Sequence, residues 1–413
     1  PWLCPMKFFS QLLLLTLPLP LACTTQTTVE PWDGGVAFPD ERPALALPAG
    51  AVGFVSNSYS DSITVLDPAA GPAPNALKSL ATVGVGRDPV AVDGPHHLAV
   101  DRRPGGGGYV YIALSYPADT LTLGPHAGHG TSTRLGWLQV LALPTLAPVF
   151  SGYMDENPGD IVLSQDRSRI AVSHFNLTKA LDPKVAAADR IGRLYVYDAS
   201  TVHGNSAGDP KRIPVCRAPH GIVLDEGGHT AWVACYGEDA LAVVDLDAGT
   251  VKTTVPFVAA PTDTPTVGPY ALVPSTAGAA LAVGTTESAE LRVVEKGSLK
   301  ERFPPVKLPG AVYFPAWSMD DTRIYAPTQK PDTLQVLDGI SGALRGGRAF
   351  ADGECVRPHE VRLSPDGRSL LVVCEGDHKT PGAIVALDRE TLAFQQSLPV
   401  GLYPDRLTLA EAP

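Results

Sequence analysis

The sequence contains few charged residues and no cluster of basic ones. Only 18% of its 413 residues are Asp, Glu, Lys or Arg, and the formal net charge is −11 at pH 7. Because nucleic acids and anionic membrane surfaces are bound through basic patches, we expect neither as a direct partner. A protein partner or a small-molecule ligand is compatible with this charge.

Sequence signatures of common enzyme classes are also missing. The chain contains no Gly-x-Ser-x-Gly nucleophile motif and no phosphate-binding loop. Long helices are not expected either, because 40 Gly and 40 Pro favour short strands joined by tight turns. The composition is typical of an all-β protein.

The apolar run near the start of the chain is too short to span a bilayer. Met6-Lys7 precedes Phe8 to Leu17, a mostly apolar segment of about ten residues, which indicates an export signal. The following Leu19-Pro20-Leu21-Ala22-Cys23 resembles the end of a bacterial lipoprotein signal, although Pro20 stands where that motif usually has Leu. Ordinary signal-peptide cleavage nearby is the alternative to lipidation of Cys23.

This interpretation divides the chain into three parts. We expect a leader and signal peptide in residues 1–22, with 1–5 lying before the natural start, a tether in 23–45 and one domain in 46–413. The predicted location is the bacterial cell envelope, as a lipoprotein that faces the periplasm or is exposed on the surface. Apart from its lipid anchor, the protein is expected to have no contact with the membrane and to be a monomer.

Four cysteines remain after Cys4 in the leader and Cys23 at the lipidation site. They form two equally spaced pairs, and an exported protein meets an oxidising compartment. We therefore predict disulfides between Cys216 and Cys235 and between Cys355 and Cys374, each joining the start of a blade's inner strand to the end of its second strand. Four buried free thiols are an alternative, as is a metal–thiolate site, although only one His accompanies each pair in the repeated pattern.

The chain repeats a unit of four short strands about every 46 residues, a period typical of β-propellers. Two segments, Ala51-Val-Gly-Phe-Val-Ser-Asn and Leu363-Ser-Pro-Asp-Gly, resemble the bacterial propeller repeats named for their Tyr-Val-Thr-Asn strand. The resemblance implies the fold and carries little about function, because such repeats occur in proteins of many activities.

Seven blades are predicted, each with four antiparallel strands. Complete units start near Pro95, Pro158, Pro219, Pro269, Gly310 and Pro358. The remaining blade has three N-terminal strands, and Gly401 to Leu409 supplies its inner strand by pairing with Val52 to Ser56, which removes open edges. Six or eight blades stay open as alternatives, because Gly86 to Val92 could be an extra strand.

Propeller geometry places most histidines on one face. His96, His220 and His359 follow a proline at the start of inner strands in blades 2, 4 and 7, beside the central channel. Loops after second strands open at the same face, where we also place His126, His129, His174 and His378. His203 and His229 are expected on the opposite face.

Two interpretations of the Pro-His pattern remain. Neutral imidazoles are common transition-metal ligands, so His96, His220 and His359 are candidate ligands, although blades 2, 4 and 7 are spread around the ring. Alternatively, Pro-His belongs to the repeat, and each ring packs against or bonds to the neighbouring blade. A transition metal is the one cofactor for which the sequence offers candidate ligands.

We therefore expect a binding or scaffold protein that uses a face bearing His and Arg side chains. The ligand-binding candidates are His96, His174, His220, His359, Arg217, Arg357, Tyr270 and Asp405. No catalytic residue is assigned. The alternative is an enzyme at this face, with metal-dependent redox or lactonase-like or lyase-like chemistry, for which Glu238, Asp239, Glu287, Glu375, Asp377 and Arg406 are further candidates.

Overall fold

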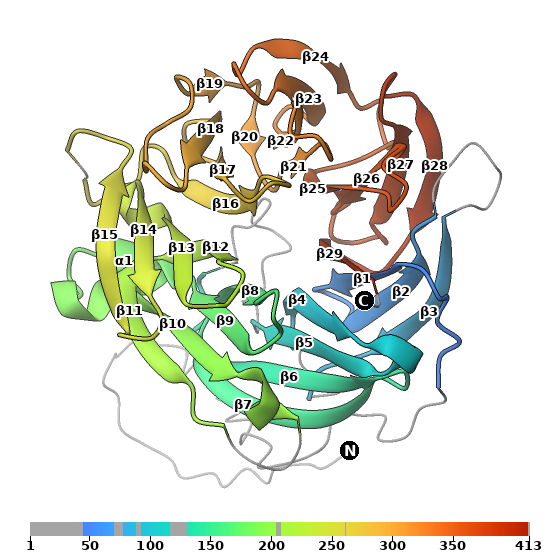
Figure 1. Cartoon of the computed structure of the whole chain (residues 1–413), viewed down its shortest axis with the longest axis horizontal. Coiled ribbons are helices and arrows are strands. Elements are labelled where there is room, and N and C mark those ends of the chain that lie inside the picture. The colour runs from blue at the N-terminus through green and yellow to red at the C-terminus, as the bar shows by residue number, and fades with distance from the viewer. Residues whose placement is uncertain are drawn as a thin grey trace, which may run out of the picture. The chain divides into compact units, whose positions relative to one another are not determined.

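The short apolar segments of the sequence form antiparallel strands that are grouped in seven sheets around a centre (Figure 1). The computed structural model describes residues 44–69, 77–87, 92–115, 130–203, 208–260 and 262–411, all within one compact unit. The predicted leader, lipidation site and most of the tether, with His126 and His129, lie outside these residues. The prediction of an all-β, seven-bladed propeller is confirmed.

The strands follow the predicted order from the inside of each blade to the outside. Blade 1 contains β29 (Pro404–Ala410), β1 (Val52–Asn57), β2 (Ser62–Asp67) and β3 (Lys78–Gly84), and blade 2 contains β4 (Pro95–Arg102), β5 (Gly108–Leu114), β6 (Leu135–Leu143) and β7 (Ala147–Glu156). Blade 3 contains β8 (Pro158–Leu163), β9 (Arg169–His174), β10 (Ile191–Asp198) and β11 (Lys211–Arg217), and blade 4 contains β12 (Pro219–Leu224), β13 (Thr230–Cys235), β14 (Ala240–Asp245) and β15 (Thr250–Pro256).

The remaining blades follow the same order. Blade 5 contains β16 (Pro269–Pro274), β17 (Ala280–Thr285), β18 (Glu290–Glu295) and β19 (Val306–Lys307). In blade 6 the inner strand is divided into β20 (Ala311–Val312) and β21 (Ala316–Trp317), followed by β22 (Arg323–Gln329), β23 (Thr333–Asp338) and β24 (Leu344–Ala349). Blade 7 contains β25 (Pro358–Leu363), β26 (Ser369–Cys374), β27 (Ala383–Asp388) and β28 (Phe394–Pro399).

Pairing of β29 with β1 closes the ring, in a register that runs from Val52 opposite Ala410 to Asn57 opposite Pro404. This pairing was predicted, and it covers the edge of β1 that does not pair with β2. The alternatives with six or eight blades are excluded by the seven sheets. Residues 88–91 of the ambiguous extra segment lie outside the described residues.

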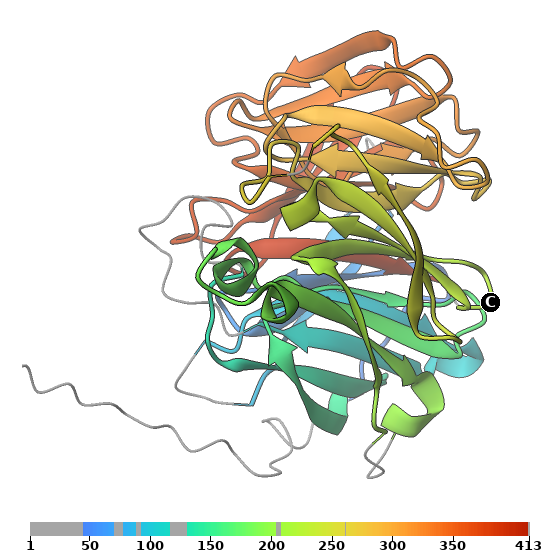
Figure 2. The ribbon, with the colours of Figure 1, turned by 90° about the vertical axis from the view of Figure 1, so that its left-hand side faces the viewer.

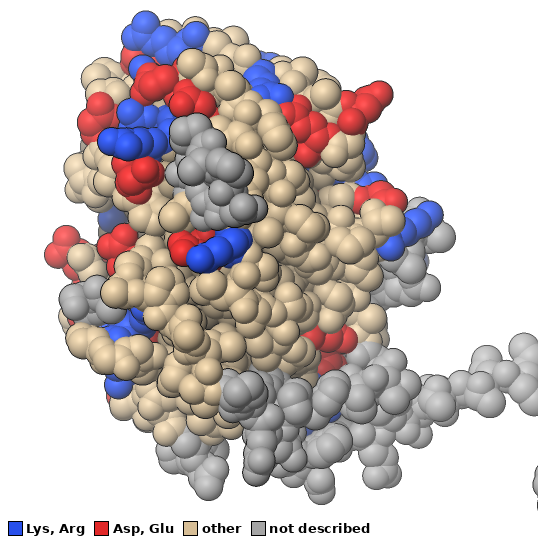
Figure 3. Space-filling view, turned by 90° about the vertical axis from the view of Figure 1, so that its right-hand side faces the viewer, with Lys and Arg blue, Asp and Glu red and all other residues tan. Residues whose placement is uncertain are grey.

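Blades pack face to face, so the middle strands are buried on both sides. All six residues of β26 are buried, whereas those of the outer strand β15 are mostly exposed. This difference explains why the sequences of the middle strands are continuous apolar runs, whereas those of the outer strands are not. On the side shown in Figure 3, acidic and basic side chains are interspersed over a mostly uncharged surface.

The inner strands all begin on one side of the ring, which we call the histidine face. In the side view, β29 runs from this face, which also carries the short helix α1 (Leu177–Leu181), to the face where the chain ends (Figure 2). Single 3₁₀ turns occur at η1 (Pro104–Gly106), η2 (Ala187–Arg190), η3 (Ala199–Val202) and η4 (Tyr236–Glu238). No helix in the described ranges is both long and apolar enough to cross a membrane.

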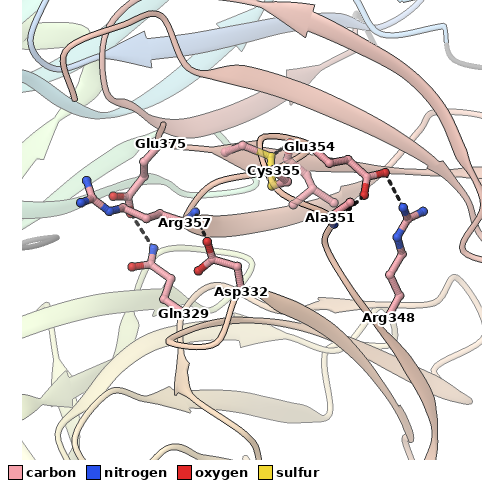
Figure 4. Close-up of a disulfide and its surroundings, with 10 residues drawn as sticks. Gln329, Asp332, Arg348, Ala351, Glu354, Cys355, Arg357 and Glu375 are labelled. Carbon is pink, nitrogen blue, oxygen red and sulfur yellow. Dashed lines mark hydrogen bonds and ion pairs between the residues drawn. A yellow bond between two sulfur atoms is a disulfide. The ribbon is translucent and has the colours of Figure 1, made fainter. Parts of the chain in front are cut away.

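Both predicted disulfides, Cys216–Cys235 and Cys355–Cys374, are present. The sequence suggested that each joins two parts of one blade, and the structure corrects this. Cys216 belongs to β11, the outer strand of blade 3, so its disulfide ties blade 3 to β13 of blade 4. Cys355 lies in the connection after β24 of blade 6, where Arg348 contacts Glu354 (Figure 4), and its disulfide reaches β26 of blade 7.

Candidate functional site

A β-bulge at the start of the inner strands directs two consecutive side chains into the channel. In β4 the pairing register shifts between Pro95 and Leu98, and the rings of His96 and His97 stack with centroids 4.1 Å apart. Simple alternation would have placed them on opposite sides of the strand. Similar register shifts follow the first proline of β8, β12, β16 and β25.

Four histidines meet at this level of the channel. The ring of His97 lies 5.6 Å from that of His220 and 6.4 Å from that of His359, and the rings of His96 and His220 are 5.9 Å apart. All four side chains are buried. The expectation that blades 2, 4 and 7 separate these histidines is therefore wrong, because the long imidazole side chains reach inward from the ring.

Each of these histidines has its Nδ1 held by a neighbouring blade. Nδ1 of His220 lies 3.1 Å from the Tyr270 carbonyl oxygen, and Nδ1 of His359 lies 2.7 Å from that of Asp405. Nδ1 of His97 contacts Asp160 Oδ1 at 2.9 Å, and that of His96 contacts the Asp405 carboxylate. The Pro-His pattern thus joins blades, as the second interpretation proposed, and it also gathers imidazoles.

Burial dominates the electrostatics of the cluster. Burial, and the neighbouring His96 and Arg406, hold the pKa of His97 well below its ordinary value, so this ring is neutral at pH 7. Burial likewise raises the pKa of Asp160, although Arg406 opposes the rise. The cluster therefore holds a neutral His97 ring beside the carboxyl group of Asp160.

Arg406 connects the buried carboxylates at this level. Its guanidinium lies 3.4 Å from Glu360 and 4.0 Å from Asp160, and it covers the Phe314 ring at 4.4 Å. Burial lowers the pKa of Arg406, but the carboxylates, Glu360 first, outweigh this and raise it. His97, Asp160 and Glu360 were not among the site residues predicted from the sequence. Their common signal is the second position after the first proline of an inner strand.

A cavity of about 520 Å³ opens beside the histidines, at blades 3 to 6. Its aromatic lining is Phe175, Tyr236, Tyr270 and Tyr313, and its polar lining includes Thr286, Glu287, Gln329 and Lys330. The Tyr236 hydroxyl donates to Glu287 at 2.6 Å. Tyr270 separates the cavity from the cluster, since its ring stacks on His220 at 3.6 Å. Of the predicted candidates, Tyr270 and Glu287 are brought to this cavity.

Other predicted candidates lie elsewhere. The ring of His174 packs against Tyr195, with centroids 4.4 Å apart, and among the described residues it makes no ring contact with the four channel histidines. Its Nδ1 lies 3.1 Å from the Arg193 carbonyl, and burial lowers its pKa to about 4. The Arg217 guanidinium donates to Asp263 and to the Thr262 carbonyl. The backbone N–H of Arg357 donates to Asp332 (Figure 4), and its guanidinium donates to the Gly376 carbonyl. Both arginines therefore act in loop packing at the histidine face.

Several remaining side chains have local structural partners. Nε2 of His378 lies 2.9 Å from Glu375 Oε2, and the His378 ring stacks on Tyr403. The other oxygen of Glu375 accepts a hydrogen bond from the Gln329 amide, which lines the cavity (Figure 4). Three carboxylates accept hydrogen bonds from backbone N–H groups of nearby loops. Asp239 accepts from residues 266–268, and Glu238 accepts from residue 217. Asp377 accepts from residues 379 and 380. His203 and His229 pair with Tyr111 and Asp247.

A second cavity, of about 530 Å³, lies at the other end of the channel. It is lined by the ends of inner strands of blades 3 to 5, and its cationic side chains are Lys296, Arg362 and Arg406. Arg406 therefore stands between the two halves of the channel.

Comparison with solved structures finds the same fold at low sequence identity. The periplasmic gluconolactonase of Pseudomonas aeruginosa is 17% identical with a TM-score of 0.58, and the match covers 88% of this chain and 100% of that one. A Bacteroides uniformis protein provisionally named a 6-phosphogluconolactonase is 14% identical with a TM-score of 0.58, and the match covers 87% and 100%.

The dihydro-heme d1 dehydrogenase NirN is 15% identical with a TM-score of 0.54, and the match covers 89% of this chain and 77% of NirN. No protein-family model matches the chain, and neither does any curated protein sequence. At these identities the structural likeness shows the β-propeller fold alone.

Proposed function

We propose that the protein is an exported, lipid-anchored β-propeller that binds a small cyclic polar ligand at its histidine face. The observation that carries this proposal is the cavity of about 520 Å³ lined by four aromatic rings. A concave, aromatic site of this size is typical of small-molecule binding. It therefore favours a small ligand over a protein partner at this position.

The lining suggests the chemistry of the ligand. Aromatic rings offer flat apolar surfaces, while Glu287, Gln329 and Lys330 offer an acceptor, an amide and a cation around them. A sugar-sized ring with hydroxyl or carboxylate groups matches both features. Tyr270 gives the cavity a rigid floor, because it is buried between His220 and Tyr313.

Calorimetric titration with gluconate and with glucono-1,5-lactone tests the proposal. We expect saturable binding that weakens about two- to tenfold in Tyr236→Ala, because an aromatic contact contributes about 0.5–1.5 kcal/mol. Tyr153→Ala is the matched control, since Tyr153 is 44% exposed and packs on Trp137 away from the cavity. The proposal fails if neither compound binds, or if Tyr236→Ala binds as tightly as the control.

Lactone hydrolysis is the second candidate function. Two solved neighbours carry names for lactonases, and the His378–Glu375 pair reaches the cavity through Gln329. Water would add to the lactone carbonyl carbon, the ring C–O bond would break, and the ring oxygen would leave as a hydroxyl after taking a proton. Lactone consumption that is lost in His378→Gln would support the enzyme, whereas binding without consumption would support the binding protein.

Export and anchoring rest on the leader sequence and on the two disulfides, which are typical of oxidising compartments. We expect Cys23→Ser to move the protein from the membrane fraction to the soluble fraction of the cell envelope. Fractionation followed by immunoblotting measures this. Unchanged membrane association would contradict the lipid anchor.

A further inference from the structure

We infer that His96, His97 and Asp405 form a binding site for a divalent first-row transition metal, Zn²⁺ or Cu²⁺, in the channel. One nitrogen from each His and one Asp405 oxygen all lie within 4.8 Å of one another. β4 supplies both imidazoles through its bulge, and β29, the inner strand of the adjacent blade 1, supplies the carboxylate. This inference does not depend on the small ligand proposed above.

The surroundings of His97 indicate a ligand on its second nitrogen. Nδ1 lies 2.9 Å from Asp160 Oδ1, and the Asp160 carboxylate also accepts the backbone N–H groups of Ile161 and Ile222 at 3.0 and 3.1 Å. The contact with Asp160 Oδ1 places the imidazole proton of His97 on Nδ1. Nε2 of His97 is thereby left as an acceptor, and it is buried with no hydrogen-bond partner within the described part of the chain.

This carboxylate–imidazole pairing is the arrangement that orients metal-bound histidines in proteins. The Asp160 contact fixes both the tautomer and the direction of the His97 ring. His220 and His359 lie beside the site, with Nδ1 directed to a backbone carbonyl in each case. Their rings lie 5.6 and 6.4 Å from that of His97, so the site has further imidazole side chains around it.

The charge of the site also favours a cation. Three buried carboxylates, Asp160, Glu360 and Asp405, are accompanied by two guanidinium groups, Arg362 and Arg406. The carboxyl groups outnumber the guanidinium groups, so a divalent cation bound here would lie among acidic side chains. Imidazole donors select Zn²⁺ or Cu²⁺ over Mg²⁺ and Ca²⁺, which prefer all-oxygen sites.

Metal analysis of the full chain, purified without a polyhistidine tag, tests the inference. Bound metal is removed from the protein with EDTA, and the protein is then dialysed against Zn²⁺, Cu²⁺ or Mg²⁺. The metal retained per chain is measured by elemental mass spectrometry. We expect about one Zn²⁺ or Cu²⁺ per chain and no retained Mg²⁺. Failure of the wild-type protein to retain either transition metal would overturn the inference.

Variants locate the metal. We expect His97→Gln and Asp405→Asn to retain less than about a tenth of the wild-type metal, and Asp160→Asn to bind it about 10 to 100 times more weakly. His229→Gln is the matched control, because His229 is exposed and pairs with Asp247 on the opposite face. Full retention by Asp405→Asn, or equal loss in the control, would overturn the assignment.

A spectrum of the wild-type protein keeps the inference testable if these variants do not fold. Electron paramagnetic resonance of the Cu²⁺-loaded protein should show coupling to at least two imidazole nitrogens. Coordination by oxygen alone would contradict a site built on His96 and His97. The spectrum should also be identical before and after addition of gluconate, so its outcome is separate from the ligand proposal.

Discussion

Removal of the disulfide between blades 3 and 4 should lower stability by an amount set by its loop length. Cys216 and Cys235 are 19 residues apart, and closing a loop of this size in the unfolded chain is worth about 3 kcal/mol. Unfolding entropy of about 2.1 cal/mol/K per residue over residues 46–413 converts this to a fall of about 4 °C in Tm. Scanning calorimetry of Cys216→Ala/Cys235→Ala measures the shift.

The second disulfide supplies a matched comparison. Cys355 and Cys374 are also 19 residues apart, so the same reasoning predicts an equal loss for their double variant, although one disulfide begins in a strand and the other in a connection. A difference larger than about 1 kcal/mol, or no loss in either variant, would refute the loop-closure reasoning. Four free thiols in the denatured, unreduced protein would contradict the disulfides themselves.

Three further predictions concern buried groups and ring closure. The folded-state pKa of His174 is about 4 against 6.5 for the ordinary group, so its contribution is complete above pH 6.5 and about 3 kcal/mol is lost as pH falls to 4 and below. Denaturant titrations should therefore show a steeper loss for wild type than for His174→Asn over this range. Glu360→Ala should cost about 3–5 kcal/mol because it leaves Arg406 buried beside fewer carboxylates, whereas Glu390→Ala at an exposed pair should cost less than about 1 kcal/mol in the same assay. Truncation before Pro404 removes β29 and exposes the edge of β1, so size-exclusion chromatography should show aggregates, and a monodisperse product would contradict the closure.

The blades could be predicted from the sequence because each unit contains residues that mark where its strands begin and end. A proline marks the start of each inner strand in blades 2 to 5 and in blade 7, and middle strands are continuously apolar, so the order of strands and the closure by β29 could be deduced. The position of Cys216 was harder. A register shift between Gly192 and Arg193 lets β11 continue to Arg217, so this cysteine belongs to blade 3.

The candidate site was only partly predictable, because it depends on irregular backbone. His96, His220 and His359 follow the repeat and could be assigned to the channel. His97 could not be assigned to the channel, because strand alternation would direct its side chain away from the channel. Only the β-bulge of β4 turns it toward the channel. The cavity is formed by loops of several blades, whose approach in space depends on the curvature of the ring and leaves no local pattern in the sequence. Tyr236 was therefore not among the predicted site residues.

A crystal structure of the protein grown with gluconate would show which of the two cavities of the channel holds the ligand. We expect electron density for the ligand at the histidine face, between Tyr236 and Tyr270. Density at the opposite end instead, beside Lys296 and Arg362, would contradict the assignment of function to the histidine face.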